Sequence, residues 1–171
     1  MRQLIWLLPY WKPHFGSKTA KNTATDAAVA VSKTALCTYL ENNATNISIT
    51  HTDKYVAVII NDNDEVGIDC ESLDRDFSAV EKKALSEDEI DDLDDEKRNE
   101  QLAIYWCAKE AVYKKLSQYN VDFAEQIEIS EFRMRTEGEL EATFINKDGY
   151  EEELELQYIT FDRHVLVWVV A

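Results

Sequence analysis

The sequence is poor in residues that interrupt regular structure, with four glycines and two prolines among 171 residues. Long flexible linkers are therefore not expected, and the length fits one domain or two tightly joined lobes. No apolar run approaches the roughly 20 residues that span a bilayer. The start, MRQLIWLLPYW, lacks a small-residue cleavage site. We expect a protein without a membrane partner, whose first residues form a strand.

Cysteine is scarce as well, because Cys37, Cys70 and Cys107 are the only three and lie far apart. Their odd number and their spacing match neither a disulfide framework nor a zinc site. Free cysteines of this kind behave as small buried hydrophobes and fit a reducing compartment. We therefore expect a cytoplasmic protein.

Basic residues are few in most of the chain. Residues 1–60 hold six Lys and Arg against three Asp and Glu, whereas residues 61–171 hold twelve against thirty-one. Non-specific nucleic-acid binding needs a basic surface, and the net charge here is −16, so we expect no nucleic-acid partner. A metal cation is a more natural partner for the acidic part.

The hydrophobic share of 45% is ordinary for a globular protein and allows a real core. Alternating apolar residues and turn signals predict an α+β fold, with antiparallel sheets packed against helices. Ser86 followed by Glu89 fits a capping box at a helix start. We expect strands near 1–11, 46–52, 54–60, 65–71, 125–134, 139–145, 150–161 and 164–170, and helices near 24–40, 86–93 and 100–118.

Two acids, Asp69 and Glu71, follow an apolar run in the stretch VGIDCES. Side chains alternate faces along a strand, so both carboxylates share the face of Gly67. Two carboxylates placed in this way raise each other's pKa unless a cation lies between them. Gly67 leaves space beside Asp69 that a backbone or a ligand could enter. The alternative is a strand that ends in solvent, and these residues alone do not choose between the two.

The predicted helix over residues 100–118 carries charges at unexpected places. Glu110 and Lys114 share a narrow flank between two packed arcs, where a plain i,i+4 salt bridge would contribute only about 0.3–0.5 kcal/mol. Lys109 falls near the centre of the aromatic arc, and its alternative reading is a snorkelling stem. We expect Trp106 to pack the helix and to do nothing else.

Read together, VGIDCE and WCAKEAVYK resemble the two signature motifs of the 4'-phosphopantetheinyl transferases, G-[IV]-D-x-E and W-x-x-K-E-A-x-x-K. Between them, LSEDE is similar to the F-S-x-x-E segment of that family, with Leu85 in the Phe place. Upstream, SITHTDKYVAV resembles the I-S-H-S stretch, with Thr50, His51 and Thr52 in place. The four motifs occur in the family's order over residues 46–118.

The resemblance implies a fold and a reaction. It is to the larger, monomeric type that activates surfactin synthetase, which is also related to holo-acyl-carrier-protein synthase. It implies two similar α+β lobes with pseudo-twofold symmetry, about 1–65 and 66–171, the first one shortened, with the active site between them. The reaction would move 4'-phosphopantetheine from coenzyme A to a serine of an apo acyl or peptidyl carrier protein and release 3',5'-ADP.

The resemblance also implies roles for single residues. Glu110 would be the base for the carrier serine, and Lys114 would stabilise the leaving ADP. Mg²⁺, or Mn²⁺ in its place, would be held by three carboxylates: Asp69, Glu71 and Glu110. Coenzyme A would be contacted by three further residues: Thr50, His51 and Lys109.

The chain departs from the family at one point, because the Arg-rich helix and the G-K-P segment before the I-S-H-S stretch are absent. The groups that would hold the adenine and the 3'-phosphate are therefore not identifiable. This departure keeps open a degenerate member that binds coenzyme A or a carrier domain without catalysis. Another Mg²⁺-dependent phosphotransferase is disfavoured because the sequence has no P-loop or kinase-type glycine loop. An acidic adaptor with solvated carboxylates is the third alternative.

Overall fold

The computed structural model describes residues 3–9 and 46–170, and the predicted helix over residues 24–40 lies outside them. The described part is mixed α and β, as the sequence predicts. Its helices are α2 (Ser78–Ala84), α3 (Glu87–Asp91), α4 (Arg98–Leu116) and α5 (Phe123–Gln126). Its strands are β1 (Leu4–Pro9), β2 (Asn46–His51), β3 (Tyr55–Asn61), β4 (Ile68–Ser72), β5 (Ile127–Ile129), β6 (Glu137–Ile145), β7 (Glu151–Phe161) and β8 (His164–Val169).

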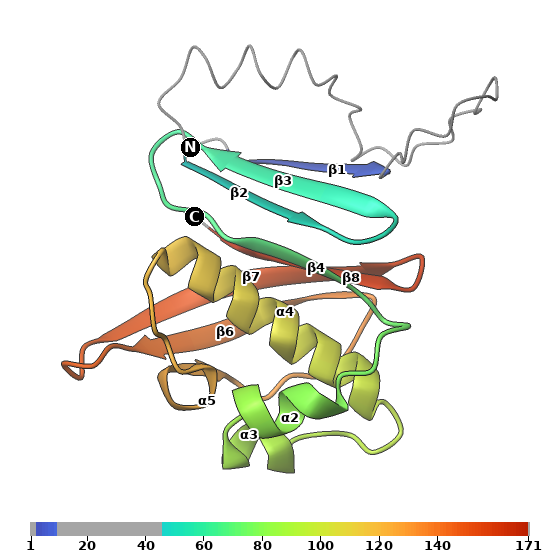
Figure 1. Cartoon of the computed structure of the whole chain (residues 1–171), viewed down its shortest axis with the longest axis vertical. Coiled ribbons are helices and arrows are strands. Elements are labelled where there is room, and N and C mark those ends of the chain that lie inside the picture. Colours follow the sequence, from blue (N-terminus) through green and yellow to red (C-terminus); the bar gives the residue numbers. More distant parts are fainter. Residues whose placement is uncertain (1–2, 10–45, 171) are drawn as a thin grey trace.

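The strands form two antiparallel sheets (Figure 1). The smaller sheet has the order β1-β3-β2, and the larger has the order β4-β8-β7-β6-β5. The predicted hairpin of residues 46–60 is confirmed, because Asn46 lies opposite Asn61 and His51 opposite Val56. Within the larger sheet, Asp69 lies opposite Val167.

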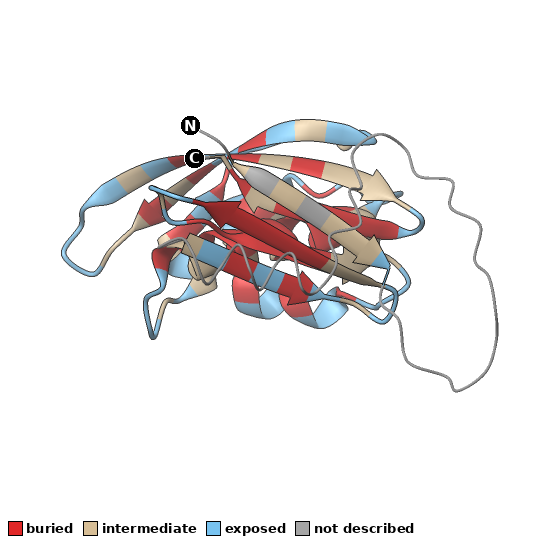
Figure 2. Cartoon of the chain, turned by 90° about the horizontal axis from the view of Figure 1, so that it is seen from above, coloured by how far each residue is buried: buried red, intermediate tan, exposed pale blue. Residues whose placement is uncertain are grey.

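Helix α4 lies across one face of the five-stranded sheet, while the three-stranded sheet lies on the other side of β4 (Figure 1). The helix is buried on most of its circumference, including Leu102, Ile104 and Val112. These side chains pack against Val165 and Val167 of β8 in the main core. Burial of such a side chain contributes about 1.5–3 kcal/mol. Figure 2 shows buried residues along the strands and exposed ones at the hairpin ends.

A second, smaller core joins the two sheets. Ile68 and Cys70 of β4 point toward Ala57 and Ile59 of β3, so the alternation predicted for this strand is confirmed. Cys70 and Cys107 are both free and buried, as predicted, whereas Cys37 lies outside the described residues. Burial raises the pKa of the Cys70 thiol to about 12, with smaller contributions from neighbouring acids. The thiol is therefore protonated at neutral pH.

Two hydroxyl groups join β2 to β4. The amide N of Ile68 donates to Ser48 Oγ at 3.2 Å, and the amide N of Cys70 donates to Thr50 Oγ1 at 3.3 Å. Both amides belong to β4, on the side away from β8. Side chains of β2 therefore satisfy backbone donors that a further strand would otherwise take.

Three short elements differ from the sequence-based expectation. Helix α2 was not predicted, because its seven residues bury only Val80 and Ala84 and show too little of a helical period. The strand predicted over residues 125–134 is reduced to β5. Its first part is the single turn α5, which Asp122 caps by accepting from the amides of Ala124 and Glu125. The capping box of Ser86 and Glu89 is confirmed at α3.

No helix in the described ranges is both long enough and apolar enough to cross a membrane.

Gly67, the residue just before β4, lies directly against the backbone of α4. A Cβ atom there would lie 1.8 Å from the carbonyl O of Ala111 and 2.9 Å from the amide N of Lys115. Any side chain at this position would therefore push α4 away from the sheet. The space that the sequence predicts beside Asp69 is filled by a helix backbone.

We expect Gly67→Ala to destabilise the protein by more than about 3 kcal/mol, because overpacking against backbone atoms cannot relax by a change of rotamer. The matched control is Gly149→Ala, at a positive φ of 79° with nothing near the new Cβ. That control should cost roughly 1–2 kcal/mol. Urea unfolding measures both, and an equal loss in the two variants would contradict the close contact.

Candidate active site

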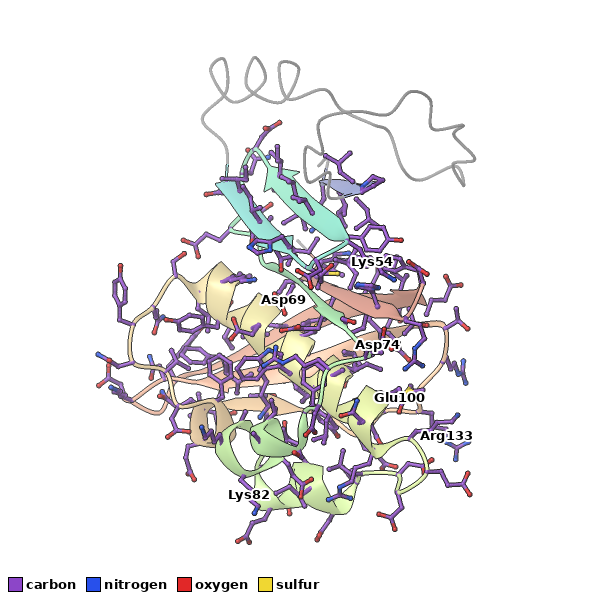
Figure 3. The ribbon with its side chains drawn as sticks, turned by 45° about the vertical axis from the view of Figure 1, so that its right-hand side comes forward. Lys54, Asp69, Asp74, Lys82, Glu100 and Arg133 are labelled. Atoms are coloured by element: carbon purple, nitrogen blue, oxygen red, sulfur yellow. The ribbon has the colours of Figure 1, made fainter. Side chains whose placement is uncertain are left out.

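Asp69 lies on β4 where the strand passes between α4 and the three-stranded sheet (Figure 3). Its Oδ1 accepts hydrogen bonds from Thr50 Oγ1 at 2.9 Å and from Lys114 Nζ at 2.7 Å. The side chain is buried, and no N–H or O–H group within residues 3–9 and 46–170 donates to its second oxygen, Oδ2. One carboxylate is thus contacted from β2 and from α4, and both of these contacts are made to the same oxygen.

Lys114 reaches from α4 across to β4. Its ammonium group donates to Asp69 Oδ1 and also to the carbonyl O of Ile68 at 3.1 Å. Among the described residues it forms no ion pair with Glu110, so the plain i,i+4 salt bridge left open by the sequence is not present. The Lys114 side chain is partly exposed.

Glu71 is the second acid on β4, and two donors hold one of its oxygens. Its Oε1 accepts from Trp106 Nε1 at 3.1 Å and from Arg75 NH1 at 2.7 Å. Burial raises the pKa of Glu71, Asp69 raises it further, and Arg75 opposes both. The alternative in which the strand simply ends in solvent therefore does not describe Glu71.

Glu110 of α4 is half-buried beside the same acids. Burial raises its pKa first, followed by the charge of Asp69, while Lys114 opposes the shift and Glu71 adds to it. The structure therefore brings the three acids that the sequence singled out into one electrostatic neighbourhood. Two elements that are about 40 residues apart in sequence supply them, which the sequence pattern predicts.

The three acids do not surround a common point as they stand. In the described part of the chain, no group of three or more His, Cys, Asp or Glu side chains is arranged to hold a metal ion. The contacts above account for this, because Asp69 is turned to Lys114 and Glu71 to Arg75. The cations that face these carboxylates come from the protein itself.

Lys109 lies elsewhere, and the coenzyme contact predicted for it stays a prediction. Its side chain is 0% exposed. The ammonium group donates to Glu89 Oε2 at 2.6 Å and to the carbonyl oxygens of Ile127 at 2.6 Å and Phe123 at 2.9 Å. All three donor positions are therefore used inside the core. Burial lowers the pKa of Lys109, while Glu89 raises it.

The two residues predicted on β2 are placed differently from each other. Thr50 is buried, and its hydroxyl is already bonded to Asp69 and to the amide of Cys70. Its one hydroxyl proton is thus used on Asp69 and helps to orient that carboxylate, and the coenzyme contact of Thr50 stays a prediction. His51 is exposed at the end of the strand, and its contact with a phosphate stays a prediction.

Sequence reasoning missed two residues that contact Glu71. Trp106 was expected only to pack, yet its indole N–H is bonded to the acid while its ring lies 5.6 Å from that of Phe123. A half-buried indole N–H usually has a hydrogen-bond acceptor, and this rule could have indicated that Trp106 contacts a polar group. Arg75 follows β4 in a turn, and no periodic pattern connects it with Glu71.

The family model of the 4'-phosphopantetheinyl transferase superfamily matches residues 65–169, which is more than half of the chain. The chain belongs to this superfamily. A search of curated proteins found no match. The matched range contains Asp69, Glu71, Glu110 and Lys114 but not Thr50, and it runs from just before β4 to the end of β8.

Membership in the 4'-phosphopantetheinyl transferase superfamily supports a transferase of the phosphopantetheine group in general. The charged residues of β4, α3 and α4 fall into two separate groups. Asp69, Glu71, Glu110 and Lys114 form the candidate site, whereas the ion pair of Lys109 and Glu89 ties α3, α4 and β5 together.

The buried pair of Lys109 and Glu89 generates a stability prediction. Lys109→Met should cost about 3–5 kcal/mol, because Glu89 would stay buried without its counter-charge. Lys115→Met is the matched control on the same helix, since Lys115 pairs at 3.0 Å with Glu152, a partner far more exposed than Glu89. The control should cost no more than about 1 kcal/mol.

Urea unfolding of the two variants, together with the double variant Lys109→Met/Glu89→Gln, measures these differences. The double variant should recover part of the loss, because no charge then remains buried. If Lys109→Met were as stable as Lys115→Met, the structural role of Lys109 would be refuted.

Proposed function

We propose that this protein transfers 4'-phosphopantetheine from coenzyme A to a serine hydroxyl of an apo acyl or peptidyl carrier protein, with Mg²⁺ (or Mn²⁺) and with release of 3',5'-ADP. The observation that carries the proposal is the meeting of Asp69 and Glu71 on β4 with Glu110 and Lys114 on α4. Superfamily membership supports the transfer in general. The metal, the carrier protein and the role of each residue are parts of the proposal.

The donor set suits a hard divalent cation. Mg²⁺ prefers carboxylate oxygens, waters and substrate phosphates, and the site offers the carboxylates of Asp69, Glu71 and Glu110. No N–H or O–H group in the described part of the chain donates to the buried Asp69 Oδ2, and an unpaired buried acceptor costs about 1–3 kcal/mol. A cation beside it would remove that cost. When bound, the metal would neutralise charge on the pyrophosphate as a Lewis acid.

In the proposed reaction the serine oxygen bonds to the phosphorus that carries the pantetheine arm, and the bond from that phosphorus to 3',5'-ADP breaks. Glu110 takes the serine proton, directly or through water. The ammonium group of Lys114, partly exposed beside Asp69, stabilises the charge on the departing ADP. Thr50 and Trp106 hold Asp69 and Glu71 in orientation.

The division into two lobes belongs to the same proposal. Residues of about 1–65, which include the three-stranded sheet, would form the first lobe, and residues of about 66–171, which include nearly all of the matched range, would form the second. We propose that the molecule acts as a monomer in the cytoplasm, with the site at the junction of β2, β4 and α4.

The direct test is to incubate the protein with coenzyme A, Mg²⁺ and an apo carrier protein and to weigh the carrier by mass spectrometry. We expect the mass to rise by one phosphopantetheine group. Asp69→Asn and Glu110→Gln should abolish this rise, whereas the isosteric change Glu152→Gln on β7 should not. Coenzyme A binding without any adduct would establish the non-catalytic alternative instead.

Neighbouring lysines give a second test. Lys114→Ala should lower turnover roughly 10²–10³-fold at saturating coenzyme A and carrier, as the loss of one transition-state contact does. Lys115→Ala removes the same charge from the next residue but breaks only the pair with Glu152. Its turnover should stay near that of the wild type. Equal turnover in the two variants would return Lys114 to a structural role.

A further inference from the structure

Arg75 is the cation that contacts the second acid of the site. Its NH1 group lies 2.7 Å from Glu71 Oε1, the same oxygen that accepts from Trp106 Nε1. Neither donor takes Oε2. We propose that Arg75 is a built-in counter-cation that competes with the divalent metal for Glu71, so that Arg75 sets the metal affinity of the coenzyme-free site. This inference rests on the proposed function.

Among the three side chains that donate to Asp69 or Glu71 from α4 and from the turn after β4, Arg75 is the one most easily displaced. Trp106 is fixed in α4 and packs on Phe123, and Lys114 has two hydrogen bonds to β4. The Arg75 side chain, in contrast, is 49% exposed. Its guanidinium forms one ion pair among the described residues and lies 4.9 Å from the centre of the Phe77 ring.

The backbone of Arg75 is anchored separately from its side chain. Its carbonyl O accepts from Asn99 Nδ2 at 2.9 Å, and its amide N donates to the carbonyl O of Ser72 at 3.2 Å. The turn after β4 is therefore held in place whether or not the guanidinium contacts Glu71. The side chain can leave the acid without any movement of β4.

The charges at the site make the competition necessary. Three acids (Asp69, Glu71 and Glu110) face two cations, Lys114 and Arg75. A divalent ion added to this set would meet a guanidinium already placed on one of its ligands. Cations that share a carboxylate repel each other, so the metal binds at the expense of the contact between Arg75 and Glu71.

There is space for the guanidinium away from Glu71. Arg75 lines a cavity of about 470 Å³ together with Lys83, Trp106, Asp122 and Phe123. The cavity is lined by one carboxylate, Asp122, which caps α5, and by one ammonium group, Lys83, besides its apolar walls, so a displaced guanidinium finds room there without any net charge in the lining. The same cavity adjoins the indole that keeps its bond to Glu71.

The test is a titration of the full-length protein with Mn²⁺ at about pH 8, without coenzyme A, followed by the electron paramagnetic resonance signal of the free ion. We expect Arg75→Gln to bind Mn²⁺ about two- to fivefold more tightly than the wild type, the scale of a partly exposed ion pair. Asp69→Asn should weaken the binding.

Arg163→Gln is the matched control. It removes the same charge from an exposed side chain that pairs with Asp74 at 3.1 Å and does not contact the three acids. Its affinity for Mn²⁺ should equal that of the wild type. Thermal unfolding without metal checks that each variant is folded, and the Mn²⁺-induced rise in melting temperature should be largest for Arg75→Gln.

The outcomes separate the inference from the function on which it rests. If Arg75→Gln binds Mn²⁺ as the wild type does, or more weakly, Arg75 is no competitor, although the metal site stands. If both arginine variants bind Mn²⁺ more tightly by the same factor, the gain comes from the loss of one positive charge anywhere on the protein, and the inference fails. If no variant binds Mn²⁺ and transfer still occurs, the proposed metal ligands are wrong as well.

Discussion

The close contact of β4 with α4 positions every group of the site. Gly67 lets the strand backbone lie against the carbonyl of Ala111, and the next outward-facing positions on that side of the strand are Asp69 and Glu71. At this separation Lys114 spans from the helix to the strand with a hydrogen bond of 2.7 Å. A wider gap would leave the lysine in solvent and the aspartate without its partner. The geometry of the candidate site thus depends on one residue that has no side chain.

Much of the architecture followed from local pattern. The strands alternate clearly, the β2–β3 hairpin has short-range pairing, and the capping box of Ser86 and Glu89 is a four-residue signal. Helices α2 and α5 did not follow, since one buries two side chains and the other is a single turn. Helix α2 contacts α4 and α5, and α5 contacts β6, and no short window of sequence records such contacts between distant segments.

The candidate site was predictable to the extent that its residues lie on regular elements. The period of a strand placed Asp69 and Glu71 on one face, and the period of a helix placed Lys109 within a buried arc. The helical period of α4 could not predict that Lys109 pairs with Glu89, because Glu89 lies 20 residues away on another helix. The coenzyme contact that the resemblance implies for Lys109 stays a prediction, and in the structure its ammonium group is buried and paired with Glu89. Arg75 was missed because it lies in a turn.

The two sheets share a boundary without a strand ladder. Ser48 and Thr50 accept from the amides of Ile68 and Cys70 with hydroxyl oxygens at 3.2 and 3.3 Å, so the two halves can part without unzipping a row of backbone hydrogen bonds. Amide exchange at Ile68 and Cys70 then reports how often this seam opens, whereas amides inside either sheet report deeper unfolding. Because Asp69 lies between these two amides in the chain, each opening of the seam also exposes the buried carboxylate to water and to ions.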